Sequence, residues 1–338
     1  MDQELKGLIG RLTEYSKGCE DKCLDFQAVQ FEAKESESRL HTPMRSYFFK
    51  SDPKNLRDPK IVHALKQFCG ICGIPYTFFA KNPEFMKNQI VQTWLTSLKP
   101  EKSAVLAKLR ITPGGKDYII RALLPVEFTN IPNAEILTMI SDVIGDDFYI
   151  DFVIGEDRDD LLLHVRFISK DTFDVGDEIC STGFSVITSE LGAAPISIET
   201  MLFRTSSKAA MIAGYSGESY FESDYEGIQP SALRELFPRL VQTLRDQLPE
   251  IKHSVHSAID KIQKKEEIND LLRLLRLKKG LGEKFHRLLF QEVENNKIES
   301  RWDFVNRISI LAKDFDSTAR IKIEKASGEF IGLIFDKT

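Results

Sequence analysis

The change of hydrophobic period near residue 103 constrains the fold more than any other feature of this chain. Residues 104–111 and 118–124 are apolar segments of strand length, and the Pro-Gly-Gly spacer between them is typical of a β-hairpin. One more hairpin and three single strands are predicted downstream, over residues 148–154, 161–168, 183–189, 196–204 and 208–214. Because a single short helix, at 133–144, interrupts this series, we expect a predominantly antiparallel sheet rather than alternating βαβ units.

Helical spacing of apolar residues dominates the two ends of the chain. A strand is predicted at 24–31, and residues 33–60, which carry three prolines, indicate a loop or connector. Beyond Tyr225 the pattern is helical throughout. The helices expected on this basis lie near the N-terminus and at residues 60–73, 82–98, 250–278, 283–295 and 301–314, with a last one from about residue 321.

These patterns predict an α+β fold, with a central predominantly antiparallel sheet flanked by helices and followed by an α-helical C-terminal region. The 338 residues, 42% of them hydrophobic, are enough to bury one large core or two modest ones. We divide the chain into an N-terminal helix, strand and connector (1–59), an α+β core (60–227) and a helical C-terminal region (228–338).

No segment of the chain predicts export or membrane insertion. The first residues lack the apolar stretch of a signal peptide, and no apolar run approaches the roughly 18–20 residues that span a bilayer. Five cysteines, an odd number, fit reduced thiols. We therefore expect a cytoplasmic protein without a membrane partner.

Two cysteine pairs have spacings that suit a metal ion: Cys19 with Cys23, and Cys69 with Cys72. Together they could supply four thiolates to zinc. Both pairs lie in segments with a helical pattern, which favours small buried hydrophobic side chains instead. Zinc binding by these cysteines stays open, and no cofactor is predicted.

The charge of the chain is unevenly distributed. Residues 252–287 contain ten Lys or Arg and five Asp or Glu, so this segment carries +5 in a protein of net charge −5. Basic residues grouped in one helical hairpin of an acidic protein are typical of a phosphate-binding face. An ordinary solvated helix surface, with its charges paired one turn apart, is the alternative.

Cations on the predicted strands extend the candidate interface. Lys108 and Arg110 are two residues apart on one strand, so they point to the same face of the sheet. The full candidate set for nucleic-acid binding comprises Lys108, Arg110, Lys116, Arg121, Arg204, Lys208, Arg273, Arg276, Lys278, Lys279 and Lys284. The prediction is that the fold brings the strand cations and the helix cations into one groove.

No catalytic motif is present, so the chain is not predicted to be an enzyme. It lacks a GxSxG elbow, a GxxxxGK[ST] loop and an HExxH motif. Eight acidic residues between 142 and 160 could hold a divalent cation, but their spacing fits a solvated hairpin tip better. A metal-dependent enzyme of unrecognised type is the least favoured interpretation.

Several phrases of the sequence resemble the phage- and plasmid-encoded proteins that carry the domain of unknown function numbered nine hundred thirty-two. The resemblance spans roughly residues 60–335 and is strongest over 175–192. The phrases that carry it lie at residues 73–83, 91–95, 109–111, 120–125, 131–137, 175–192 and 302–309. The chain departs from the family at Thr188, where Asn is frequent, and at residues 205–209, where a Cys-x-Asn-Gly-like phrase is expected.

The resemblance implies a bacteriophage or mobile-element protein that acts in the bacterial cytoplasm without an established catalytic activity. Two classes of function follow. The first is a non-catalytic accessory protein of DNA metabolism that binds nucleic acid, with single strands as one candidate ligand. The second is a protein-interaction or self-assembling protein, such as a host-factor inhibitor or structural component, without nucleic-acid binding. In both cases we expect a homo-oligomer or a host or phage protein partner.

Overall fold

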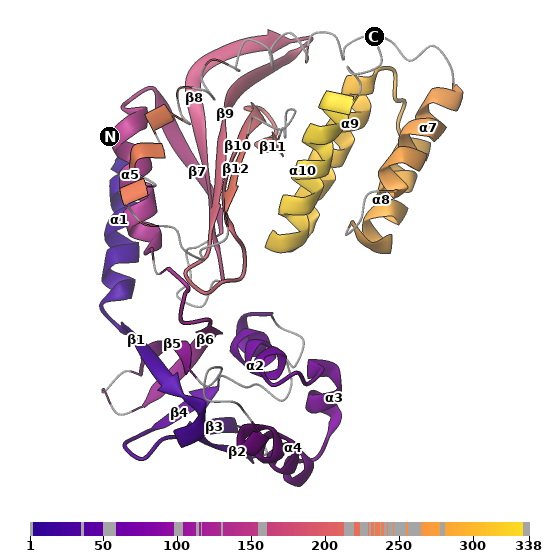
Figure 1. Ribbon diagram of the computed structural model, residues 1–338. Coiled ribbons are helices and arrows are strands. Elements are labelled where there is room, and N and C mark those ends of the chain that lie inside the picture. The colour runs from indigo at the N-terminus through magenta and orange to yellow at the C-terminus, as the bar shows by residue number, and fades with distance from the viewer. Residues whose placement is uncertain are drawn as a thin grey trace.

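The computed structural model of the chain describes most of its residues. These are residues 3–34, 37–49, 59–97, 104–112, 115, 117–129, 131–154, 161–212, 220–223, 265–277 and 281–333, with isolated positions between 229 and 255. Their fold is α+β, as predicted: two largely antiparallel sheets flanked by helices, and a helical C-terminal region. Figure 1 shows the two sheets in separate halves of the molecule.

The first half is built on a six-stranded sheet with the order β1-β5-β6-β4-β3-β2. All neighbours pair antiparallel except β4 and β6, which are parallel. Helices α2 (Pro59–Ile71), α3 (Tyr76–Lys81) and α4 (Glu84–Ser97) complete this half. The strands are β1 (Cys19–Asp25), β2 (Gln30–Lys34), β3 (Glu37–His41), β4 (Ser46–Phe49), β5 (Ala104–Ile111) and β6 (Tyr118–Leu124), with a 3-10 turn, η1 (Phe26–Ala28), after β1.

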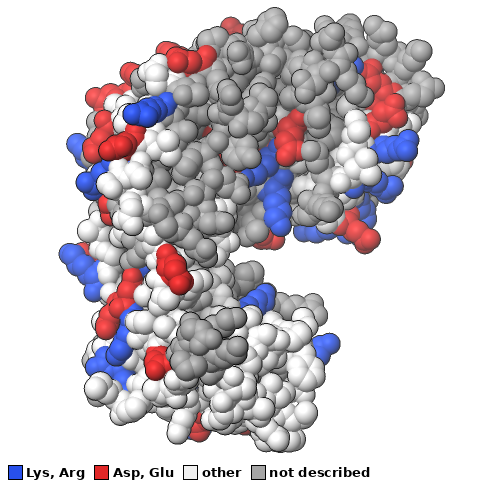
Figure 2. Space-filling model, in the orientation of Figure 1, with Lys and Arg blue, Asp and Glu red and all other residues white. Residues whose placement is uncertain are grey.

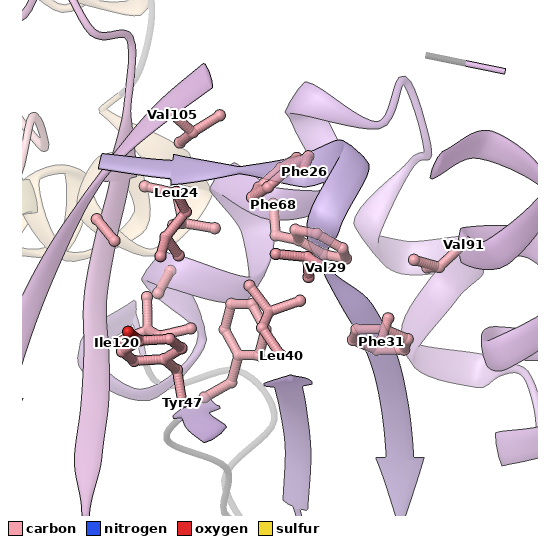
Figure 3. Close-up of a cluster of buried hydrophobic side chains, with 14 of the residues drawn as sticks. Leu24, Phe26, Val29, Phe31, Leu40, Tyr47, Phe68, Val91, Val105 and Ile120 are labelled. Atoms are coloured by element: carbon pink, nitrogen blue, oxygen red, sulfur yellow. The ribbon is translucent and has the colours of Figure 1, made fainter. Parts of the chain in front are cut away.

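An aromatic core holds the first half together. Phe68 of α2 stacks on Phe31 of β2 with ring centroids 5.3 Å apart, and Phe26 meets Phe68 edge to face at 5.7 Å. Figure 3 shows these rings beside Tyr47 and Ile120, which come from strands far apart in the sequence. Burial of such large side chains is the main force that fixes α2 on the sheet.

The second half contains the sheet β11-β10-β9-β8-β7, antiparallel throughout, with β12 paired to β10. Helices α1 (Gln3–Ser16) and α5 (Asn133–Ile144) lie on one side, and α9 and α10 stand on the other (Figure 1). The strands are β7 (Phe148–Ile154), β8 (Leu163–Val175), β9 (Glu178–Thr188), β10 (Ile196–Arg204), β11 (Ala209–Ile212) and β12 (Tyr220–Ser223). The C-terminal helices are α7 (Lys265–Arg276), α8 (Gly282–Asn295), α9 (Arg301–Leu311) and α10 (Ser317–Leu333), with a 3-10 turn, η3 (Ala312–Asp314), before α10.

A polar row crosses the second sheet beneath α10. Asp151, Arg166, Ser185 and Glu199 are cross-strand neighbours on β7, β8, β9 and β10. Arg166 is fully buried and donates to Asp151 and to Glu324 of α10, and Lys325 of α10 donates to Glu199. Alternation within the strands therefore places charges, not apolar side chains, against the last helix.

The two halves meet at the segment after β9. The carbonyl oxygen of Leu191 accepts hydrogen bonds from His63 Nε2 at 2.9 Å and Gln67 Nε2 at 3.1 Å, both on α2. Gln67 Oε1 in turn accepts from the backbone N–H of Leu123 on β6, at 3.0 Å. These bonds tie the first sheet to the second.

The structure corrects several sequence-based expectations for the first sixty residues. The predicted connector at 33–60 contains the end of β2 and all of β3 and β4, whose buried side chains include Leu40, Tyr47 and Phe49. Cys19 and Cys23 lie on strand β1, not on a helix. Because β1 to β4 share a sheet with β5 and β6, the boundary at residue 59 does not separate two folding units, and the single central sheet is in fact two.

Candidate nucleic-acid interface

Lys108 on β5 lies inside the protein and not on an open sheet face. Its Nζ donates to Asp21 Oδ2 at 2.7 Å, and the residue is 5% exposed. Burial lowers the pKa of Lys108, and the hydrogen bond that Lys108 donates to Asp21 opposes that shift. The ammonium also lies 5.9 Å from the ring centroid of Phe128. A buried, ion-paired ammonium cannot contact a phosphate, so Lys108 does not belong to an exposed interface, contrary to the prediction.

The other cations of the first hairpin lie near Lys108 and are half-buried where the structure describes them. The β5–β6 register shifts after Lys108, so that Lys108 pairs with Ala122, Leu109 pairs with Ile120, and Arg121 lies at the bulge. Such a bulge redirects a side chain, and Arg121 Nη1 donates to Cys19 Sγ on β1 at 3.4 Å. Arg110 pairs with Cys19 across the strands. Lys116 lies outside the described residues.

Arg204 and Lys208, at the end of β10 and in the turn after it, differ from each other in exposure. Arg204 is 4% exposed, and its Nε and Nη2 both donate to the Glu178 carboxylate. This bidentate pair occupies two of the three guanidinium nitrogens, so Arg204 is not a free surface cation. Lys208 is exposed in the turn.

The helical hairpin carries the accessible cations of the candidate set. Arg273 and Arg276 on α7 are exposed, and neither forms an ion pair with a carboxylate that the structure describes. Lys284 on α8 is exposed, with its Nζ 5.0 Å from the ring centroid of Phe315. Lys278 and Lys279 lie outside the described residues. The structure thus favours the helix cations over the strand cations, which the fold does not bring into one groove with them.

Two adjoining hollows occupy the groove between α7 and α8. They share Arg276, His286 and Phe290, and Phe290 is 49% exposed although it is a large apolar side chain. The smaller hollow, about 230 Å³, is lined by Arg273 and Arg276, and no carboxylate is among the described residues of its lining. The larger, about 600 Å³, includes the carboxylates Glu283 and Glu294 in its lining. Positive charge beside an exposed ring is therefore concentrated in the smaller hollow.

His286 is the titratable group within this groove. Partial burial, followed by the charge of Arg276, lowers the pKa of His286. The imidazole is therefore neutral near pH 7, where it offers a flat ring and a hydrogen-bonding nitrogen. The positive charge of the smaller hollow comes from the arginines alone.

Sequence reasoning missed three residues of this groove: His286, Arg287 and Phe290. The buried stripe of α8 includes Phe285 and Leu289, so Phe290, one residue later, falls off that stripe. His286 and Phe290 are four residues apart and share a face next to that stripe. An aromatic residue displaced from the apolar stripe of its helix was the signal available in the sequence.

Figure 2 shows how these charges are placed on the molecule. Lys and Arg side chains gather over the C-terminal helices, with acidic side chains among them. A wide recess separates those helices from the half built on the first sheet. The described part of the first half shows fewer charges on this face.

The alternative sites considered from the sequence gain no support among the described residues. No group of three or more His, Cys, Asp or Glu side chains is arranged there to hold a metal ion. Cys69 and Cys72 are buried in the first core, whereas Cys23 is exposed on β1. Within the acidic segment 142–160, residues 155–160 lie outside the described residues.

Comparison with known proteins gives no assignment: no family model, curated protein or solved structure matches the chain. In the part of the chain that the structure describes, no helix is both long enough and apolar enough to cross a lipid bilayer.

Proposed function

We propose that this protein binds nucleic acid, with unpaired strands preferred, through the groove between α7 and α8, and that it does so without catalysis. The proposal keeps the setting implied by the sequence resemblance, an accessory protein of DNA metabolism in a phage or plasmid, acting in the bacterial cytoplasm. It replaces the wider strand-and-helix surface with the helices alone.

One observation carries the proposal: Arg273 and Arg276 share a hollow with the half-exposed ring of Phe290, and the described residues that line it include no carboxylate. Arginines three apart on a helix lie on one face, at a spacing that can follow a phosphate backbone. An exposed aromatic ring in the same hollow supplies a surface on which a base stacks, and bases are accessible for stacking when they are unpaired. Charge and ring together therefore favour a single strand over a duplex.

The first test is fluorescence anisotropy with a labelled oligothymidine and a duplex of equal length, over a range of salt concentrations. For the single strand, the double variant Arg273→Gln/Arg276→Gln should reduce the slope of log K against log salt by about 1.4, roughly 0.7 per lost contact. The matched control is Lys6→Gln/Lys17→Gln, which removes the same charge from α1 and the turn after it and should leave the slope unchanged. Absence of binding by the wild type, or equal loss in both double variants, would refute the proposal.

The second test addresses stacking. Phe290→Ala should weaken single-strand binding by about 1–3 kcal/mol and leave the weaker duplex binding largely unchanged. Phe85→Ala is the matched control, because Phe85 is 69% exposed on α4 in the other half. An equal effect of both substitutions on the single strand would show that the ring of Phe290 does not contact a base.

A second candidate function, self-assembly, is favoured by an apolar patch on α3 and α4. Phe78, Phe85 and Met86 are 50%, 69% and 36% exposed within nine residues of sequence. Clustered exposed apolar side chains are characteristic of protein-interaction sites. Sedimentation velocity of the wild type and of Phe85→Lys tests this function: concentration-dependent association that the substitution lowers would support it, and a monomer at all concentrations would exclude it.

A further inference from the structure

The turn between β10 and β11 holds a residue in a backbone conformation that most L-residues avoid. Lys208 has φ of 49°, and no other non-glycine residue that the structure describes has a positive φ. Arg204 pairs with Ala209, so the turn comprises residues 205–208. Gly or Asn would adopt the conformation of Lys208 with less strain. Strained positions persist where the surrounding structure fixes them, and they are frequent at binding sites.

Lys313 of η3 contacts this turn from the neighbouring layer. Its Nζ donates a hydrogen bond to the carbonyl oxygen of Ser207. Both Lys313 and Lys208 are exposed, and neither forms an ion pair with a carboxylate that the structure describes. The contact thus brings an ammonium without a counter-charge to the backbone beside Lys208.

The charges of three guanidinium groups act on Lys313. Partial burial lowers the pKa of Lys313 most. The positive charges of Arg320, Arg166 and Arg204 lower it further, and the charge of Asp151 opposes the shift weakly. The carboxylates that face them are already bound: Asp151 and Glu324 to Arg166, Glu324 also to Arg320, and Glu178 to Arg204. Of these four cations, Lys313 is the one that forms no ion pair with a described carboxylate.

Two polar atoms at this turn lack a hydrogen-bond partner among the described residues. They are Oγ of Ser207 and Nη1 of Arg204, and both atoms are buried. Arg204 itself is 4% exposed. Buried donors without acceptors are unfavourable, and a ligand with several acceptor oxygens would satisfy them. The positive charge of Lys313 and the unpaired donors thus both favour an anionic ligand with several acceptor oxygens.

We propose that the β10–β11 turn and η3 form a binding site for a phosphate-type oxyanion. Lys313 and Lys208 contribute the two exposed cations, and the Ser207 hydroxyl and the Arg204 guanidinium lie beneath them as further donors. The chemistry that the site recognises is a tetrahedral anion with several oxygens, supplied either by free phosphate or by one phosphate of a nucleic-acid backbone. The proposal does not depend on nucleic-acid binding at α7 and α8.

The experiment is a titration of the full chain with inorganic phosphate, followed by thermal unfolding at constant ionic strength set with chloride. The wild type should show a saturable rise of its unfolding midpoint. Lys313→Met should weaken the apparent phosphate affinity at least tenfold, Lys313→Arg should retain it within about threefold, and Lys6→Met on α1 should behave as the wild type. No saturable response, or a response equal in wild type and Lys313→Met, would overturn the proposal.

A second variant separates binding from folding. Lys208→Gly relieves the positive φ and removes one cation, so it should raise the unfolding midpoint without phosphate while weakening phosphate affinity several-fold. A variant that is more stable and still binds less cannot owe its loss to misfolding. If Lys208→Gly binds phosphate as tightly as the wild type, the turn is not part of the site and the proposal fails.

Oligonucleotide binding distinguishes the two sources of the anion. If a nucleic-acid phosphate occupies the site, Lys313→Met lowers the salt slope of oligothymidine binding by about 0.7. If free phosphate occupies it, Lys313→Met leaves that slope unchanged. Either result is consistent with an oxyanion site at this turn. Arg273→Gln/Arg276→Gln should leave the phosphate titration unaffected. The experiments can therefore refute nucleic-acid binding at α7 and α8 without refuting oxyanion binding at this turn, and the reverse.

Discussion

Replacing Glu324 by Gln tests the charged row beneath α10. The Glu324 side chain is 1% exposed, and it accepts from fully buried Arg166 and, at 2.9 Å, from Arg320. Removing one partner of a buried ion pair costs about 3–5 kcal/mol, since the other charge stays buried. Asp151 remains 3.1 Å from Arg166 and keeps part of the attraction, so we expect the lower end, about 3 kcal/mol.

Urea unfolding measures this loss of stability in the half of the molecule that contains Glu324. Of the two tryptophans, Trp302 packs in the core of the C-terminal helices and Trp94 in the first core. In a Trp94→Phe background, the fluorescence of Trp302 therefore reports the second half. With a urea m-value of about 2–3 kcal/mol/M, the midpoint of Glu324→Gln should fall by about 1 M.

Two further variants decide whether buried charge is the cause. Glu14→Gln removes one partner of an exposed pair with Lys17 and should shift the midpoint by no measurable amount. Arg166→Met/Glu324→Gln removes both members of the buried pair and should be more stable than Glu324→Gln alone. A Glu324→Gln midpoint equal to that of Glu14→Gln, or a double variant less stable than the single one, would refute the reasoning.

Three other expectations follow from the same structure. Burial, reinforced by neighbouring cations, holds the pKa of His164 well below its usual value, so the unfolded chain binds a proton below about pH 6.5 that the folded protein does not. The free energy of unfolding should fall on acidification by up to about 1.4 kcal/mol per pH unit, and His164→Gln should flatten urea midpoints between pH 6.5 and 5. Gly183→Ala would place a Cβ 2.1 Å from the carbonyl oxygen of Phe167, so circular-dichroism melting should show a loss of at least about 3 kcal/mol; a wild-type melt would contradict that geometry. Burial raises the pKa of Cys69 to about 12, so this thiol should resist a disulfide reagent at pH 8 until the protein unfolds, whereas exposed Cys23 should react at once.

The sequence predicts the regular elements of this fold where local signals are strong. The bounds expected for 104–111 and 118–124 are those of β5 and β6, because alternation and a Pro-Gly-Gly turn act within a few residues. The missed strands, β3 and β4, are four or five residues long, and β4 pairs in parallel with β6, about seventy residues away. Short strands stabilised by distant partners leave no local pattern, and the prolines nearby indicated a loop instead.

The lack of a local signal for distant contacts also explains why the sequence did not show that Lys108 is buried. Spacing alone places Lys108 and Arg110 on one face of their strand, but it does not show what covers that face. The structure places Phe128 and the Asp21 carboxylate there, so the charge is neutralised inside the protein. On α7 the candidate arginines are exposed, because a helix at the surface keeps one face in solvent whatever packs on the other.

Strand cations and helix cations therefore have different roles in this protein. In the second sheet, Arg166 and Arg204 are flanked by other strands and by helices, so each is buried and needs carboxylates close by to be tolerated. Arg273 and Arg276 bear the same charge on an exposed helix and have no described carboxylate partner. Charge without an internal partner is available to a ligand, and the chain's net charge of −5 makes such cations stand out against an acidic background. The accessible, unpaired arginines, and not the total number of basic residues, are thus the feature on which binding of a polyanion should depend.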